Sequence, residues 1–186
     1  LIAGEAYAMS SPSTLHQALV SELLVQLSLT FRGGPCRALV SPLDVKLSEH
    51  DVVQPDLLVV CAPEQLRTHF VEGPPALIVE VLSPSTLRHD RVRKLNLYSQ
   101  VGVAEYWLVT PRPFLFEVLH LVEGVFQHVG SYTEADVLNS RRFPDLRLPL
   151  LELYERLPPQ PPLEEVREGT PLYAQKPPND WEAKRP

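Results

Sequence analysis

Apolar and polar residues alternate along this chain with two different periods, and the longer period predicts a helix near the start. Between residues 14 and 32 leucines recur at intervals of three and four, which is typical of an amphipathic helix: Leu15, Leu19, Leu23, Leu24 and Leu27. Ser13 and Thr14 offer a hydroxyl group that can cap the first turn, and Gly33-Gly34 can end the last one. The pattern therefore predicts a helix over residues 14–32.

Shorter apolar runs predict the strands. We expect strands over residues 5–9, 36–47, 52–60, 77–82, 105–109, 115–122 and 125–132. Pro42 is expected at an edge or a bulge, and Glu123-Gly124 has the composition of a hairpin turn. A short helix is expected over residues 64–70, and a longer one that follows Ser83–Thr86 and ends near Val101. This mixture of elements indicates an α/β protein.

The composition divides the chain into a folded part and a tail. Of its 186 residues 44% are hydrophobic and the mean hydropathy is -0.07, as in soluble globular proteins. After Leu157, eight of the 20 prolines fall within the last 29 residues, among mixed charges and few aliphatic side chains. Because such a segment cannot build a core, we expect one domain over residues 1–157 and an extended proline-rich tail over residues 158–186, either loose or laid across a neighbouring subunit.

Hydropathy and the cysteines bear on the compartment. No apolar run approaches the roughly 18 residues that a membrane-spanning helix needs, and no basic-then-apolar leader is visible. Cys36 and Cys61 show neither zinc-site spacing nor a disulfide framework, so we expect two separate thiols, buried as small apolar groups. These features favour a cytoplasmic protein with no membrane partner.

The net charge of -6 argues mildly against a protein that coats nucleic acid. Acidic residues around a metal ion, however, count as negative in a sequence but are neutralised in the occupied site. A local basic patch can also contact phosphates on a protein of net negative charge. Charge alone therefore does not exclude a nucleic-acid substrate.

Two carboxylates interrupt apolar runs in the middle of the chain. Asp56 follows Pro55 within the run Val52–Val60, and Glu80 lies in Leu77–Leu82, which is otherwise apolar on both faces and typical of a central strand. An ionised carboxylate in a protein interior costs several kcal/mol unless it is paired or binds a metal. A divalent cation bound between Asp56 and Glu80 would remove that cost and could take part in catalysis.

The helix that ends near Val101 carries charges on its apolar side. At about 100° per residue, Asp90, Lys94 and Tyr98 fall on the side of the aliphatic residues, whereas Arg93 falls on the opposite side. A surface pair of Asp90 and Lys94 is the simpler interpretation and would be worth about 0.3–0.5 kcal/mol. Their position on the apolar side favours a place in a site, where a lysine can orient water and stabilise charge that develops on a phosphate.

Several strings of residues, taken in order and at their spacing, resemble one known family. They are Gly4-Glu5, Ser11-Pro12 with His16, Ser41–Val45, Val53–Leu57, Glu80–Thr86, Asp90, Lys94, Tyr98, Gly102-Val103 and Glu105–Val109. Pro55-Asp56, followed by Glu80 on the next predicted strand, is similar to the PD-(D/E)XK nuclease superfamily. More narrowly, Ile2–Leu153 resembles the Uma-two family, whose members are described as "putative restriction endonucleases".

The resemblance implies a restriction-endonuclease-like fold, in which a central mixed β-sheet is flanked by helices and extended by an antiparallel hairpin and a C-terminal tail. The lysine that the superfamily has two residues after the glutamate is replaced by Leu82. In the Uma-two family a lysine on the following helix is implied to take its place, and here that residue is Lys94. Lys94 and Tyr98 also resemble the Gln-x-x-x-Tyr helix of related nucleases.

The site residues follow from this resemblance and from the need of phosphodiester hydrolysis for oxygen-bound Mg²⁺ or Mn²⁺. Asp56 and Glu80 are expected as carboxylate ligands, with the backbone carbonyl of Val81 and Glu5 as additional ligands. Lys94 is expected to orient or activate the attacking water. The groups expected to support these residues or to contact the substrate are Asp90, Tyr98, His16 and Gln54.

Two classes of function remain open. The first is a metal-dependent endonuclease that hydrolyses phosphodiester bonds of DNA with a Mg²⁺-activated water. It is expected to act as a homodimer or higher homo-oligomer, because paired subunits suit cleavage of two strands. The second is a non-catalytic DNA-binding or assembly module with a vestigial nuclease site, which the net acidity and the missing strand lysine favour. The presence of Asp56, Glu80 and Lys94 together favours the enzyme.

Overall fold

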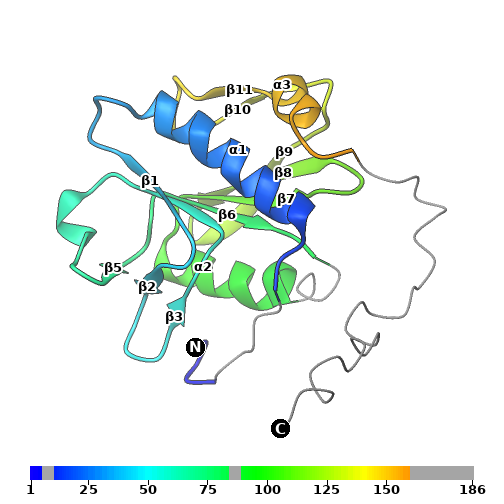
Figure 1. The fold of residues 1–186 in the computed structure, drawn as a ribbon. Helices are drawn as coiled ribbons and strands as arrows, with labels where there is room; N and C mark the ends of the chain where they lie inside the picture. The colour runs from blue at the N-terminus through cyan, green and yellow to red at the C-terminus, as the bar shows by residue number, and fades with distance from the viewer. Residues whose placement is uncertain (6–10, 84–88, 160–186) are drawn as a thin grey trace, which may run out of the picture.

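The computed structural model describes residues 1–5, 11–83 and 89–159. A six-stranded sheet with the order β1-β4-β6-β7-β8-β9 forms the centre of the molecule (Figure 1). Its strands are β1 (Arg37–Val40), β4 (Leu57–Val60), β6 (Leu77–Val81), β7 (Glu105–Thr110), β8 (Leu115–Val122) and β9 (Val125–Tyr132). Neighbouring strands run antiparallel except for β6 and β7, which are parallel, so the sheet is mixed, as predicted.

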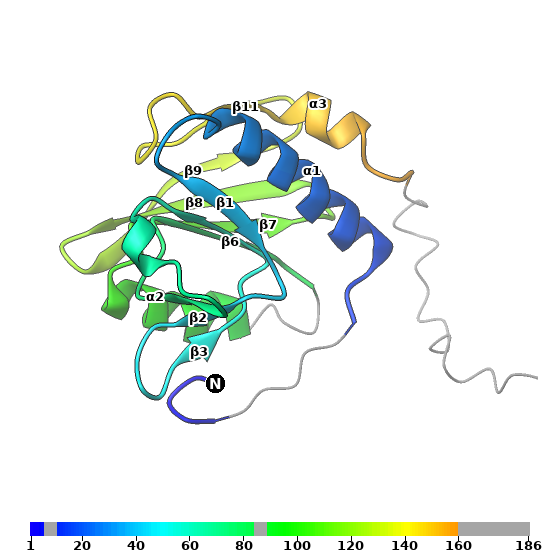
Figure 2. The ribbon, with the colours of Figure 1, turned by 60° about the vertical axis from the view of Figure 1, so that its left-hand side comes forward.

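Helices cover both faces of this sheet. Helix α1 (Thr14–Thr30) lies on one face and α2 (Leu95–Val101) on the other, as the two views of Figures 1 and 2 show. Because side chains alternate along a strand, each face has its own apolar core. Val79 on β6 belongs to the core under α1, whereas its neighbour Ile78 belongs to the core against α2. The central strands are therefore buried on both sides.

Helix α1 confirms the first prediction from the sequence. Ser13 caps its N-terminus, since Ser13 Oγ accepts a hydrogen bond of 3.2 Å from the backbone N–H of His16. The helix ends at Thr30, and the chain then turns through Gly33, whose φ of +80° favours glycine. The predicted leucine stripe faces the sheet, with four members buried and one partly buried: Leu15, Leu19, Leu23, Leu27 and Leu24.

Two predicted strands are each divided at a proline. The second predicted strand consists of β1 and β2 (Asp44–Lys46), which are separated by the cis Ser41-Pro42 bond. The third consists of β3 (Val52–Val53) and β4, which are separated by Gln54-Pro55. Proline has no N–H to donate to a neighbouring strand, so an apolar run that continues through it does not make one continuous strand.

The predicted helix over residues 64–70 is wrong beyond a single turn. Pro63–Gln65 form a 3₁₀ turn (η1), and the chain is extended again in β5 (Phe70–Glu72). Strands β2, β3 and β5 build a second, smaller sheet with the order β3-β2-β5. The chain thus leaves the central sheet between β1 and β4 and again between β4 and β6.

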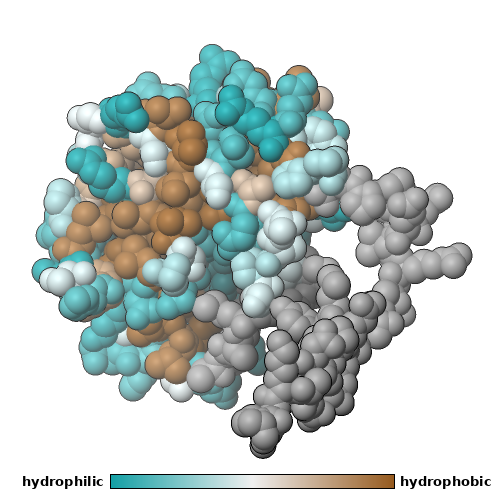
Figure 3. Space-filling view, in the orientation of Figure 1, coloured by the Kyte–Doolittle hydropathy of each residue, from teal (hydrophilic) through white to brown (hydrophobic). Residues whose placement is uncertain are grey.

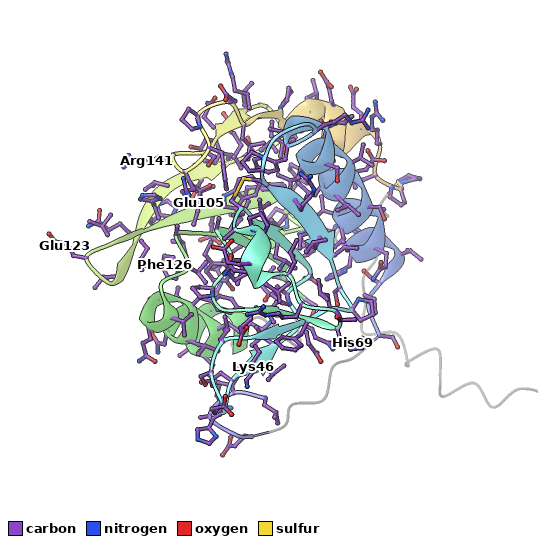
Figure 4. The ribbon with its side chains drawn as sticks, turned by 90° about the vertical axis from the view of Figure 1, so that its left-hand side faces the viewer. Lys46, His69, Glu105, Glu123, Phe126 and Arg141 are labelled. Carbon is purple, nitrogen blue, oxygen red and sulfur yellow. A yellow bond between two sulfur atoms is a disulfide. The ribbon has the colours of Figure 1, made fainter. Side chains whose placement is uncertain are left out.

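The later elements follow the prediction, and three more were not predicted. β6 lies between β4 and β7, and β8 and β9 form a hairpin with Glu123 at its tip (Figure 4). Glu123 and Gly124 both have positive φ, as the turn signal requires. The additional elements are β10 (Val137–Asn139), β11 (Arg147–Pro149) and α3 (Leu150–Glu155). Helix α3 packs beside α1.

Two predicted elements fall mostly outside the described residues. Of the predicted strand over residues 5–9 only Glu5 is described, and it forms an isolated bridge with Ile2. Of the predicted tail over residues 158–186 only Pro158 and Pro159 are described. Within the described ranges no helix is long and apolar enough to cross a membrane. The face in Figure 3 carries hydrophilic side chains between its hydrophobic patches.

Glu105, at the start of β7, is a fully buried carboxylate that the fold satisfies internally. Trp107 Nε1–H donates a hydrogen bond of 2.8 Å to its Oε1, and the backbone N–H of Arg142 donates one of 3.1 Å to its Oε2. A buried carboxylate requires such donors. The second bond ties the loop between β10 and β11 to the central sheet.

The expectation of two separate thiols is wrong, because Cys36 and Cys61 form a disulfide. Strands β1 and β4 pair with Arg37 opposite Val60, so the next residues along, Cys36 and Cys61, face each other with Cα atoms 3.9 Å apart. Their separation of 25 residues in the sequence could not indicate this, since it depends on which strands pair. The cysteines therefore give no support to a reducing compartment.

We predict that the disulfide adds about 3 kcal/mol to the free energy of unfolding, because it restricts a long loop of the unfolded chain. Cys61→Ser, or reduction of the unmodified protein, should lower the urea midpoint measured by circular dichroism. In the Cys36→Ser/Cys61→Ser double variant the reductant should change nothing. An unchanged midpoint after complete reduction, verified by counting thiols, would contradict the prediction.

Candidate functional site

Asp56 lies directly before β4, at the end of the strand that adjoins β6. Its Oδ2 accepts a hydrogen bond of 2.8 Å from the backbone N–H of Val81 and lies 3.2 Å from His16 Nε2. Its Oδ1 accepts no hydrogen bond from any residue that the structure describes. The side chain is 22% exposed. Asp56 is thus held in one orientation from two sides and keeps one oxygen available.

Glu80 lies near the end of β6 and is 3% exposed. Lys94 Nζ lies 2.8 Å from Glu80 Oε1, and the Tyr98 hydroxyl donates a hydrogen bond of 2.8 Å to the same oxygen. The lysine side chain is 16% exposed. The cost of burying Glu80 is therefore offset by a charged partner and a hydroxyl donor that both come from the same helix.

Strand pairing brings the two carboxylates to one place. Strand β4 begins where the antiparallel β6 ends, and Leu57 faces Val79 across the pair. The same register, continued by one residue, sets Asp56 beside Glu80. Asp56 then contacts α1 through His16, while Glu80 contacts the helical segment on the other face of the sheet. The site therefore lies at the margin of the sheet, between its two faces.

The segment that carries Lys94 is helical and has the predicted orientation. His89–Lys94 form a π-helical turn (η2), which leads directly into α2. Leu97 and Tyr98 are buried, whereas Arg93, Asn96 and Gln100 are exposed, as the wheel predicts. Tyr98 also packs edge-on against Tyr106 of β7, with ring centroids 5.1 Å apart. Packing of α2 therefore points Lys94 and Tyr98 toward Glu80.

His16, in the first turn of α1, is set against Asp56. Burial of the imidazole acts to lower its pKa, but the hydrogen bond and the negative charge of Asp56 outweigh burial and raise the pKa of His16 above its ordinary value of 6.5. The backbone of Val81 and the charge of Glu80 act in the same direction. Its Nδ1 is buried and makes no hydrogen bond to any described residue. A contact with metal-bound water or phosphate, as expected from the sequence, remains a prediction.

The remaining predicted site residues either contact other partners or have side chains outside the described residues. Glu5 pairs with Arg93, with 3.9 Å between Glu5 Oε2 and Arg93 Nη1, beside a hollow of about 390 Å³ between the N-terminal segment and α2. The Gln54 amide donates a hydrogen bond of 2.8 Å to Asp44 Oδ1. The side chain of Asp90 lies outside the described residues. The expected roles of these three residues stay predictions.

The carboxylate oxygens of Asp56 and Glu80 are ligands of the kind that Mg²⁺ prefers. In the described part of the chain no three histidine, cysteine, aspartate or glutamate side chains gather as ligands of one metal. The protein ligands would then be two carboxylates and the backbone carbonyl of Val81. Mg²⁺ is commonly bound through one or two carboxylates and keeps several waters, so this set suits it better than it suits zinc.

Comparisons with known proteins agree on one family and one fold. The family "Uma2: Putative restriction endonuclease" matches residues 1–151. The uncharacterized protein slr1290 of Synechocystis is 30% identical over 138 residues, which cover 73% of this chain and 72% of that protein. The crystal structure of a "putative nuclease belonging to DUF820" from Anabaena variabilis superposes with a TM-score of 0.69, at 18% identity, over 83% of this chain and 88% of that one.

The likeness to the Anabaena variabilis protein concerns the fold, a mixed sheet with helices on both faces. The family match spans both carboxylates, the lysine helix and all six strands of the central sheet. The chain therefore belongs to the Uma2 family.

Proposed function

We propose that this protein is a metal-dependent endonuclease that hydrolyses phosphodiester bonds of DNA with a Mg²⁺-activated water. The observation that carries the proposal is the contact of 2.8 Å between Lys94 Nζ and Glu80 Oε1, next to Asp56 where β4 and β6 adjoin. Two carboxylates and an amine at one end of a mixed sheet supply the groups that phosphodiester hydrolysis needs. The description of the family as "putative restriction endonuclease" supports DNA as the substrate.

Asp56, Glu80 and the Val81 carbonyl would hold the divalent cation. When bound, such an ion neutralises charge at the phosphorus and lowers the pKa of a coordinated water. Asp56 suits this task because its Oδ2 is fixed by Val81 N–H while its Oδ1 accepts no hydrogen bond from the described residues. Glu80 suits it because its position is fixed by donors from the lysine helix.

Lys94 would orient the attacking water and donate to the oxygen on which negative charge develops. The lysine side chain is 16% exposed, and its ammonium group lies against the buried Glu80, in surroundings where charge is screened less than in water. Tyr98 would keep Glu80 in place through its hydroxyl group, and His16 would do the same for Asp56. Each carboxylate would thus be oriented by a hydrogen-bonding residue from a different helix.

His16 also gives the folded protein a pH dependence. Because its pKa is raised in the folded state, folding favours the protonated imidazole beside Asp56. This contribution to the free energy of unfolding is fully present below the ordinary pKa of 6.5. It is lost as the pH rises through the raised pKa of the folded state.

We predict that Asp56→Ala abolishes binding of Mg²⁺ and Mn²⁺ in titration calorimetry and abolishes nicking of supercoiled plasmid. Lys94→Gln should leave metal binding measurable but lower kcat by about 100-fold or more, because it removes a donor to the developing charge. Glu64→Ala is the matched control, since Glu64 is an exposed carboxylate on the η1 turn. Unmodified protein that binds neither metal nor DNA would overturn the proposal. Protein that binds DNA without nicking it would favour the non-catalytic module.

A second prediction concerns the histidine. The stability advantage of the unmodified protein over His16→Gln should be largest near pH 5.5 and should shrink steadily toward about pH 8.5. Urea unfolding in the presence of a chelator measures it without competition from metal. His69→Gln, which changes an exposed histidine, should show no such trend. An advantage of His16 that grows with pH would contradict the assignment.

A further inference from the structure

A second carboxylate on the sheet is aligned with Glu80. Across the parallel pair Glu80 on β6 faces Leu108 on β7, and across the next pair Leu108 faces Glu117 on β8. Directly facing residues point to the same side of a sheet, so both glutamates rise from the face that α2 covers. Two strand spacings separate them, or roughly 10 Å.

One helical turn reaches both carboxylates. Arg91 Nη1 lies 3.1 Å from Glu117 Oε1, and Arg91 Nη2 contacts Glu117 Oε2, so the guanidinium group grips the carboxylate at two points. Three residues later Lys94 Nζ contacts Glu80 Oε1. The turn therefore lies across β6, β7 and β8, with Lys94 paired to a carboxylate on β6 and Arg91 paired to one on β8.

The turn itself contributes little apolar packing. Val92 is 52% exposed and Arg93 is exposed, whereas Leu95, directly after the turn, is partly buried against the core and Leu97 and Tyr98 are buried. The turn itself is π-helical, a wider geometry than the α-helix that follows it. Arg91 and Lys94 of this turn each contact a carboxylate on the sheet.

We propose that the Arg91–Glu117 ion pair is the positioning device that holds Lys94 against Glu80. The inference rests on the role of Lys94 in the proposed function. The pair is part-buried, with 36% of the arginine side chain and 19% of the glutamate side chain exposed, and a two-point arginine–carboxylate contact fixes direction as well as distance. Arg91 is a positioning residue, since its side chain contacts Glu117 and none of the three proposed metal ligands.

The test uses Arg91→Gln and Glu117→Gln, which remove one charge each, and the exchange Arg91→Glu/Glu117→Arg, which restores the pair. The matched control is Arg67→Gln, because Arg67 forms an exposed ion pair with Glu72 of 2.6 Å in the small sheet. The single variants should lower kcat by about 10- to 100-fold, with KM for DNA changed much less. The exchange should recover most of kcat, and Arg67→Gln should change neither constant.

A labelling experiment separates failure of this inference from failure of the proposed function. The chain has four lysines, Lys46, Lys94, Lys176 and Lys184, so the reaction of each with an amine reagent can be followed by mass spectrometry. Lys94 should react several-fold faster in Arg91→Gln and Glu117→Gln than in the unmodified protein, with Lys46 as internal reference. This readout requires no nuclease activity. Unchanged labelling of Lys94 in both single variants would overturn the inference. Faster labelling of Lys94 in the single variants, together with no DNA cleavage by the unmodified protein, would support the positioning inference and would contradict the proposed nuclease function.

Discussion

The buried charge of Glu80 is the constraint on which this structure depends. A carboxylate that is 3% exposed on a central strand is tolerated only with partners, and Lys94 and Tyr98 supply them within 2.8 Å. Both partners are on one helix, so satisfying the charge also determines where that helix lies. The parallel crossover from β6 to β7 brings the helix back over the strand that carries the glutamate. Charge compensation and chain topology thus favour the same arrangement.

The site connects the two helical layers that cover opposite faces of the central sheet. Asp56 is held by α1 through His16, and Glu80 is held from the opposite face by η2 and α2. The hydrogen bond from Val81 N–H to Asp56 Oδ2 links the two carboxylates through the backbone of β6. A shift of α1 relative to the sheet would therefore displace Asp56 first, and a shift of the η2–α2 segment would displace Glu80 first. The match to the Uma2 family, described as "putative restriction endonuclease", spans both carboxylates.

Much of the fold and part of the site could be predicted from the sequence. The spacing of the leucines predicted the buried side of α1, and the wheel placed Lys94 and Tyr98 on the sheet side of the helical segment that η2 and α2 form. The apolar runs through Pro42 and Pro55 misled the strand prediction, because hydropathy does not register the missing N–H of proline. The disulfide needed the pairing of β1 with β4, which no local pattern contains.

Two contacts had weaker signals that were available in the sequence. His16 lies three and four residues before Leu19 and Val20, both buried, so it shares the sheet-facing side of α1. Arg91 falls next to Tyr98 on the wheel of its helix at about 100° per residue. Neither position identifies a partner, because Asp56 and Glu117 are 40 and 26 residues away along the chain. Long-range pairs of this kind follow from topology rather than from periodicity.

The cross-strand cysteine link has a consequence for how the outer strand is assembled. β1 forms an edge of the central sheet and pairs with β4 at four positions. A covalent bond between directly facing residues permits a single alignment of β1 and β4. A slip by one residue would turn every side chain of the slipped strand to the opposite face. The disulfide therefore fixes the alignment of β1 with β4 at the end of β4 that lies opposite to Asp56.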